Sequence, residues 1–97
     1  MSMYNPPHPG EFIQEIYIAP FNLSARNVAN SLGVSPSTFN RLLNGKSNVS
    51  PEMALRLSKS LGRSPESWLT MQDHYNLWHV RKKINLQEVK KLNLSAA

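Results

Sequence analysis

The sequence predicts an all-α protein of five helices with a short C-terminal tail. Three Ser-Pro pairs, at 35–36, 50–51 and 64–65, are the first observation, because serine caps a helix start and proline suits the first helical position. Glycines at 33, 45 and 62 are the second, since each stands where a helix of ordinary length would end. The third is that no run of alternating apolar and polar residues bounded by turn signals predicts a strand.

The first two helices are predicted on either side of a break at Pro20. The first begins at Pro9, and its inward stripe at helical spacing consists of Phe12, Ile13, Ile16 and Tyr17. The second is predicted over residues 25–32, with Ser24 as its cap and Gly33 as its end.

The third and fourth helices follow the caps Ser35 and Ser50 and are predicted to end near Asn44 and Leu61, each just before a glycine. The fourth helix has a single apolar face, which consists of Ala54, Leu57 and Leu61. Both helices therefore have one side available to pack against the core.

The fifth helix is predicted from the cap Ser64 to about residue 82, with an apolar face made by Trp68, Met71, Tyr75 and Trp78. Trp68 and Tyr75 are expected in the core, whereas Trp78 either closes the core, which we favour, or lies on a dimer surface. Residues 83–97 are predicted to be a basic tail outside the domain of residues 1–82, either flexible or ordered by a partner, because so short and charged a segment does not fold alone.

Composition predicts one globular domain with a preference for polyanions. The chain has 97 residues, of which 40% are hydrophobic, and a formal net charge of +5. Most of that charge lies near the C-terminus, where five basic residues against Glu88 give +4: Arg81, Lys82, Lys83, Lys90 and Lys91. Because the chain has no cysteine, no signal-like start and no long apolar stretch, we expect a cytoplasmic protein without membrane association.

Residues 24–45 have the pattern of a helix-turn-helix. Two short helices that cross through a tight turn need a small residue at their contact, a glycine in the turn and apolar anchors on both sides. The residues predicted to build the motif are Val28, Ala29, Leu32, Gly33, Val34, Phe39 and Leu42. A helical hairpin that serves packing alone would use the same anchors, so the outward face of the second helix decides between the two interpretations.

That outward face is polar and contains no acidic residue, which phosphate would repel. Arginine pairs with guanine and asparagine with adenine in the major groove of DNA. The candidates for base reading are Ser35, Ser37, Thr38, Asn40, Arg41 and Asn44, with Arg41 the strongest, and the candidates for phosphate contacts are Ser24, Arg26, Lys46 and Ser47. Because one motif has a small footprint, we expect a homodimer on near-palindromic double-stranded operator DNA, joined through the fifth helix and the tail.

Five blocks of the sequence resemble HigA-type antitoxins, which belong to the XRE or lambda-repressor-like class of helix-turn-helix proteins. These blocks are His8-Pro9-Gly10-Glu11, Leu32-Gly33-Val34-Ser35, residues 41–46, residues 50–57, and Trp68-Leu69 with Gln72 and Tyr75. The resemblance implies a five-helix lambda-repressor-like domain, a dimer that represses its own toxin-antitoxin operon, and binding that neutralises a HigB-like ribonuclease toxin. A stand-alone XRE-type regulator without a toxin partner is the alternative.

Other functions find little support in the residues. Enzymatic activity is not expected, and neither is a metal or a cofactor, because His74 and His79 are five residues apart and point to different helix faces. Single-stranded RNA binding would need exposed aromatic platforms, which the predicted core positions of Trp68 and Tyr75 do not offer. The operator sequence does not follow from the resemblance, since many XRE proteins have glutamine where Ala25, Pro36 and Ser37 stand.

Overall fold

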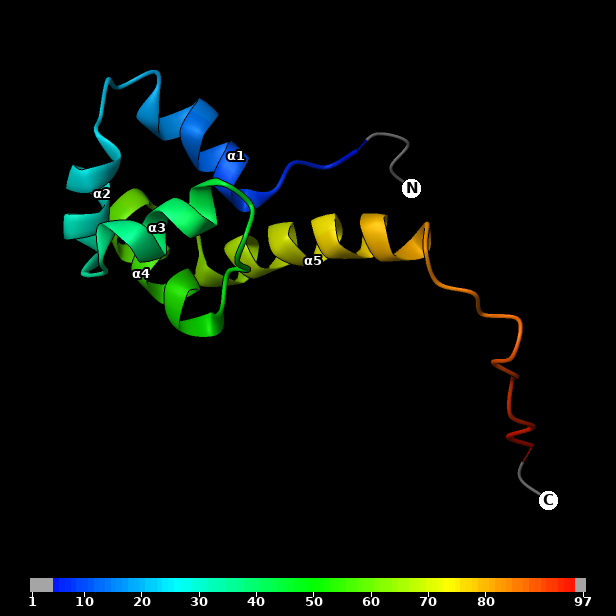
Figure 1. The fold of residues 1–97 in the computed structure, drawn as a ribbon. Coiled ribbons are helices and arrows are strands. Elements are labelled where there is room, and N and C mark those ends of the chain that lie inside the picture. Colours follow the sequence, from blue (N-terminus) through cyan, green and yellow to red (C-terminus); the bar gives the residue numbers. More distant parts are fainter. Residues whose placement is uncertain (1–4, 96–97) are drawn as a thin grey trace.

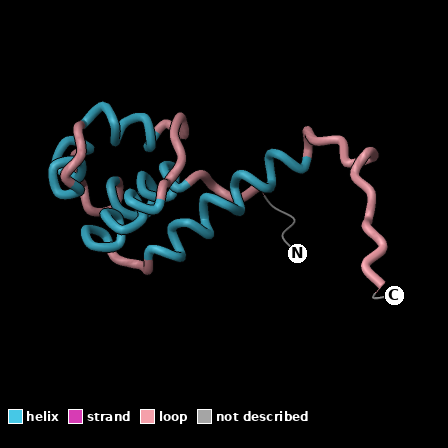
Figure 2. The backbone as a smooth tube through the Cα atoms, turned by 90° about the horizontal axis from the view of Figure 1, so that it is seen from below, coloured by secondary structure: helices cyan, strands magenta, loops and turns pink. Residues whose placement is uncertain are grey.

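The computed structural model describes residues 5–95, which form five α-helices and one π-helical segment (Figure 1). The elements in order are α1 (Pro9–Ile13), η1 (Gln14–Ile18), α2 (Ala25–Leu32), α3 (Pro36–Leu43), α4 (Pro51–Leu61) and α5 (Pro65–Arg81). Figure 2 shows helices joined by loops and no strand in this part of the chain. The predicted all-α class with five helices is confirmed.

Serine caps begin four of these helices, as predicted. The hydroxyls of Ser24, Ser35, Ser50 and Ser64 each accept a hydrogen bond from the backbone N–H three residues later, at 3.0 to 3.1 Å. A proline follows the last three of these serines, at a position where its missing N–H removes no helical hydrogen bond. The helix starts are thus fixed by local sequence.

The first helix differs from the prediction, because it changes from α to π after Ile13. Ala19 and Leu23 donate hydrogen bonds from their backbone N–H groups to carbonyls five residues earlier, those of Gln14 and Ile18. This longer turn brings Ile13 and Ile18, five residues apart, into the core together. The predicted core position of Ile16 is wrong, since its side chain is 46% exposed.

One hydrophobic core holds the bundle together. Its fully buried large side chains include Ile13, Phe39, Leu42, Leu57 and Trp68, so every α-helix except α2 contributes at least one of them. From α2, Val28, Ala29 and Leu32 complete the cluster. Tyr75 and Trp78, which we expected in the core, lie only half-buried outside this cluster, and the Lys82 ammonium is 4.8 Å from the centre of the Trp78 ring.

The C-terminal half of α5 and the residues after it extend away from the bundle (Figures 1 and 2). The principal extents of the molecule, 59 × 26 × 23 Å, show how far this extension reaches. Residues 81–95 are all exposed, and beyond Lys83 they form no helix or strand. Within the described residues, none of the helices is both long and apolar enough to cross a lipid bilayer.

Candidate nucleic-acid interface

The predicted helix-turn-helix is formed by α2, the turn at Gly33 and α3. Gly33 has a φ of 76°, a left-handed conformation that ends α2, and the N–H of Val34 returns to the Ala29 carbonyl at 3.1 Å. Ala29 is fully buried and belongs to the core cluster. Phe39 and Leu42 are the buried residues of α3 and anchor it to the core. In the turn, Val34 is half-buried and Gly33 is exposed.

The opposite side of α3 presents the residues that we predicted to read bases. The side chains of Ser37, Thr38, Asn40, Arg41 and Asn44 are all exposed. Among residues 5–95, no hydrogen bond or ion pair holds the Arg41 guanidinium. Among the described residues, the Arg41 guanidinium and the side-chain amides of Asn40 and Asn44 therefore have no hydrogen-bond partner, whereas the hydroxyls of Ser37 and Thr38 pair with that of Ser35.

Ser35, which we predicted to contact bases, also has a structural role, because its hydroxyl caps α3. It accepts the Thr38 N–H at 3.1 Å and donates to the Thr38 Oγ1 at 2.9 Å. The Ser24 hydroxyl is used in the same way at the start of α2. Both serines are exposed, yet their first role is to begin the two helices of the motif.

The remaining phosphate candidates lie before and after α3 along the chain. Arg26 is exposed in the first turn of α2, and Lys46 is exposed in the loop that follows α3. Ser47, next to Lys46, is half-buried and offers its carbonyl to another residue rather than to solvent. Of the four candidates, Arg26 and Lys46 thus carry the accessible positive charge.

A shallow groove of about 470 Å³ lies beside the contact between α1 and α3, and it is lined by residues of α1, η1, α2 and α3. Glu11 and Glu15 line it opposite Asn40 and Asn44. Carboxylates at this edge disfavour phosphate, whereas the α2 start and the loop after α3 carry Arg26 and Lys46. The exposed positive charge next to α3 therefore lies at the start of α2 and in the loop after α3, away from Glu11 and Glu15.

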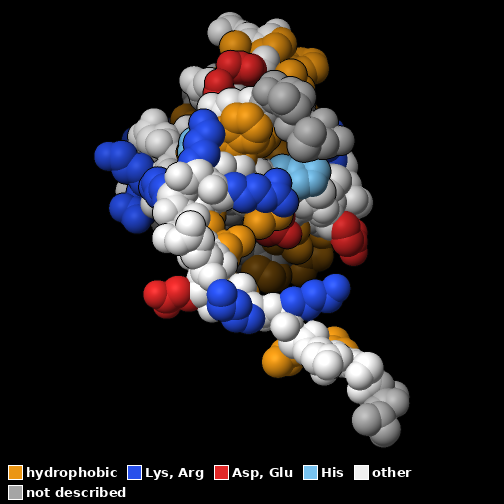
Figure 3. Space-filling model, turned by 90° about the vertical axis from the view of Figure 1, so that its right-hand side faces the viewer, with side chains coloured by type: hydrophobic (Ala, Val, Ile, Leu, Met, Phe, Trp, Pro, Cys, Tyr) orange, Lys and Arg blue, Asp and Glu red, His pale blue; other side chains and the backbone are white. Residues whose placement is uncertain are grey.

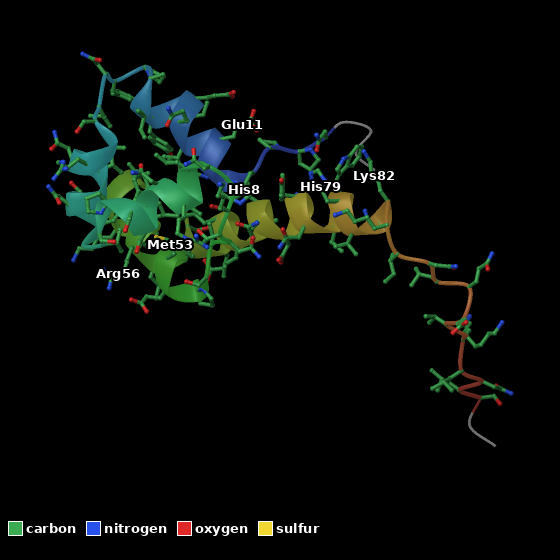
Figure 4. All side chains as sticks on the ribbon, viewed as in Figure 1. His8, Glu11, Met53, Arg56, His79 and Lys82 are labelled. Carbon is green, nitrogen blue, oxygen red and sulfur yellow. The ribbon has the colours of Figure 1, made fainter. Side chains whose placement is uncertain are left out.

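His8 connects three parts of the molecule and was not predicted to touch the interface. Its Nδ1 accepts the Gly10 N–H at 2.9 Å, which caps α1. The proton is then on Nε2, which donates to the Ser47 carbonyl at 3.0 Å. The ring also packs edge-on against Tyr75 of α5, with 4.9 Å between ring centres, and Figure 4 shows His8 where α1 and α5 meet. Burial lowers the pKa of His8 below its ordinary value, so the neutral form is favoured.

Gly10 permits a very close approach of α1 to the end of α3. A Cβ atom at this position would overlap the Leu42 carbonyl oxygen and lie 2.8 Å from the Leu43 Cα. Gly10 and Pro9 are both buried in this contact. In the His-Pro-Gly-Glu block, His8 therefore caps α1 and Gly10 allows α1 to pack closely against α3.

Gln72 fixes the loop after α3 from the other side. It is 3% exposed, and its Oε1 accepts the Val49 N–H at 2.8 Å. Its amide nitrogen donates to the Oδ1 atoms of Asn48 and Asn76 at 3.2 and 3.1 Å. A glutamine four residues after the core Trp68 was the sequence signal that could have identified this contact.

Arg56 of α4 supports the turn of the motif. Its Nη1 donates to the Leu32 carbonyl at 2.8 Å and more weakly to the Gly33 carbonyl at 3.3 Å. Glu52, four residues earlier, holds the same guanidinium through a 2.8 Å ion pair, and Figure 4 shows Arg56 beside α4. The carbonyls at the end of α2 thus have a partner, which the sequence did not reveal.

This arrangement of α2, turn and α3 within an all-α bundle defines a helix-turn-helix protein of the DNA-binding transcription-regulator class. The chain belongs to the helix-turn-helix family of XRE type, whose model, described as "Helix-turn-helix", matches residues 13–68. Over 92 residues it is 39% identical to the uncharacterised HTH-type transcriptional regulator YddM of Escherichia coli (strain K12), covering 95% of this chain and 97% of the relative.

Solved structures of antitoxins have the same fold. Antitoxin GraA in complex with its operator matches with a TM-score of 0.85 and 33% identity, over 96% of this chain and 97% of that one. An addiction module antidote protein of the HigA family from Coxiella burnetii matches with a TM-score of 0.79 and 34% identity, over 92% of this chain and 100% of that one. The resemblance to HigA-type antitoxins is confirmed.

Proposed function

We propose that the protein is a sequence-specific DNA-binding antitoxin that represses its own toxin-antitoxin operon. The observation that carries this proposal is the exposed, acid-free face of α3, where the Arg41 guanidinium is held by no other described residue. The antitoxin GraA, which shares the fold, was solved in complex with its operator. In this proposal α3 enters the major groove of double-stranded operator DNA.

The exposed side chains of α3 have separate roles in this complex. Arg41 forms a bidentate pair with guanine, and Asn40 and Asn44 contact adenine or neighbouring bases. The hydroxyls near the start of α3, those of Ser35, Ser37 and Thr38, contact base edges or phosphates. Backbone phosphates are bound by the start of α2, through Ser24 and Arg26, and by the loop residues Lys46 and Ser47.

The operator test compares Arg41→Ala with Lys59→Ala, which removes one exposed charge from α4, outside the proposed interface. Affinity is measured by titrating a labelled fragment of the chain's own promoter region. Removing a bidentate base interaction is expected to weaken binding by about 10-fold to 100-fold. The Lys59 variant is expected to bind as the unchanged protein does. Equal affinities of the two variants would contradict base reading by Arg41.

Dimerisation is proposed through the C-terminal half of α5 and the tail. Leu77 and Val80 are 47% and 48% exposed, and their spacing of three residues places them on one side of α5, while Ile84, 52% exposed, follows just after the end of the helix. Figure 3 shows apolar side chains at this end of the molecule among lysines and arginines. Two copies joined here would place their recognition helices on a near palindrome, with half-sites about 34 Å apart. Val80→Glu is expected to yield a monomer in sedimentation equilibrium, and a persistent dimer would contradict this interface.

Neutralisation of a HigB-like ribonuclease toxin is the second part of the proposal. Its support is the similarity to a HigA-family antidote protein over almost the whole chain. Arg41→Ala is expected to retain full toxin binding while operator binding weakens by about 10-fold to 100-fold, because the two ligands use different surfaces. The measurement is a titration with the product of the neighbouring small reading frame. If no such product binds, the chain is a stand-alone XRE-type regulator.

We further propose that residues 1–82 form the DNA-binding domain and residues 83–97 a basic tail that contacts either DNA phosphates or the toxin. The described part of this tail is fully exposed, which favours a role outside the bundle. Deleting residues 84–97 distinguishes the two roles. If the tail binds phosphates, the slope of log affinity against log salt falls by about one for every phosphate that the shortened chain no longer neutralises. An unchanged slope with weaker toxin binding would assign the tail to the toxin.

A further inference from the structure

We propose that His8 and Gln72 are positioning residues for the contact between Lys46 and DNA phosphate. Neither side chain lies on α3, and both act through the loop of residues 44–49. This inference rests on the proposed DNA binding. It assigns a role in binding to the two sequence blocks, at the start of α1 and in α5, that lie outside the helix-turn-helix itself.

The loop leaves α3 in a defined direction. Gly45 has a φ of 73°, and its N–H donates to the Leu42 carbonyl at 3.0 Å. The N–H of Lys46 donates to the Arg41 carbonyl at 2.8 Å. These two bonds join the backbone of Lys46 to the last turn of the proposed recognition helix.

Two buried side chains then hold the middle and the end of the loop. His8, 5% exposed, donates from Nε2 to the Ser47 carbonyl, and Gln72, 3% exposed, accepts the Val49 N–H and donates to the Asn48 side chain. Three consecutive residues after Lys46 are therefore tethered to the bundle. Val49 itself is buried in the core, which closes the loop.

Both tethers are rigid because each is held by a second group on α5. The His8 ring packs against Tyr75, and the Gln72 amide also donates to the Asn76 side chain at 3.1 Å. A loop that is ordered before DNA arrives does not lose that conformational freedom on binding. The backbone of Lys46 is thus kept in a fixed position relative to α3, from which its side chain reaches a phosphate while α3 contacts the bases.

The test is a double-mutant cycle with Lys46→Ala and Gln72→Met, a change that keeps side-chain length and removes all three hydrogen bonds of the amide. Operator affinity is measured over a range of KCl concentrations. Lys46→Ala alone is expected to reduce the log-log salt slope by about one. Gln72→Met alone is expected to weaken operator binding by roughly tenfold, because the loosened loop must then be ordered when DNA binds. It is also expected to reduce the log-log salt slope by about one, as Lys46→Ala does. Adding Lys46→Ala to Gln72→Met then changes affinity little, whereas additive effects would overturn the inference.

Two further variants control for folding. His8→Asn keeps an acceptor for the Gly10 N–H, since asparagine caps helices well, and removes the donor to Ser47. It is expected to show the same non-additivity with Lys46→Ala, so the inference stays testable if Gln72→Met does not fold. Thr70→Ala is the matched control, because it changes an exposed residue of α5 whose side chain makes no hydrogen bond among residues 5–95, and it is expected to retain the full effect of Lys46→Ala.

The outcomes separate this inference from the proposed function. If Arg41→Ala binds the operator as tightly as the unchanged protein, base reading by α3 fails, and the positioning role fails with it. If Arg41→Ala weakens operator binding as expected while Lys46→Ala is additive with both Gln72→Met and His8→Asn, only the positioning role is refuted. Melting curves for each variant show that the protein is folded at the assay temperature.

Discussion

Replacing Gly10 by alanine tests how α1 is seated on the recognition helix. The new Cβ would overlap the Leu42 carbonyl oxygen and lie 2.9 Å from the Leu42 carbonyl carbon and 2.8 Å from the Leu43 Cα. These are backbone atoms at the end of α3, so no side chain can rotate to make room. Either α1 moves away from α3 or the last turn of α3 is displaced.

The expected cost follows from two opposed effects. In an unhindered helix, alanine is favoured over glycine by about 1 kcal/mol. Forcing a methyl group into a packed contact costs about 1–3 kcal/mol and sometimes more. Because the overlap here is with backbone, we expect net destabilisation of about 2 kcal/mol, which for a domain of this size lowers the Tm by roughly 10 °C.

Thermal unfolding followed by circular dichroism measures this change. Glu11→Ala is the matched control, since it changes the next residue of the same turn, which is exposed. Its effect is expected to stay below about 1 kcal/mol, the usual value of one acidic residue near a helix start. A Gly10→Ala protein that melts at or above the unchanged protein would show that the close α1–α3 contact does not exist.

Three other perturbations probe the frame around α3. Because burial lowers the pKa of His8, the unfolded state takes up a proton at higher pH than the folded state does, so we expect the free energy of unfolding to fall as the pH drops below about 6.5. Urea titrations at pH 5.5 and 7.5 measure this fall, which is expected to be smaller in His8→Asn. The same pH dependence in both proteins would contradict the prediction. Arg56→Met leaves the Leu32 and Gly33 carbonyls without their donor, and an expected loss of about 1–3 kcal/mol is measured by urea denaturation against Lys59→Met. Ser35→Ala removes the α3 cap at an expected cost of about 1 kcal/mol, and an unchanged Tm would show that the cap is dispensable.

Local features were predictable from the sequence because their causes are local. A serine before a proline determines where α3, α4 and α5 begin, since its hydroxyl needs only an N–H three residues away. Gly33 ends α2 for an equally local reason, its left-handed backbone. The helix-turn-helix and its anchors therefore follow from spacing alone.

The π-helical turn and the tethers of the loop could not be predicted in the same way. Periodicity assumed a uniform α-helix from Pro9 onward and so favoured Ile16, whereas packing selects Ile13 and Ile18 through a longer turn. His8 and Gln72 are 39 and 23 residues away from their loop partners, Ser47 and Val49. Hydrogen bonds over such separations leave no periodic pattern in the sequence.

On α3, the residues that pack against the core are different from the residues that face solvent, and this separation affects how helix-turn-helix proteins acquire new DNA targets. Its inward residues Phe39 and Leu42 carry the packing, while Asn40 and Arg41 make no side-chain hydrogen bond within the described residues. Exchanging the outward pair therefore costs little stability, because such surface substitutions usually change it by less than about 0.5 kcal/mol. A duplicated gene can acquire a new target by altering a few exposed codons, without passing through an unfolded intermediate.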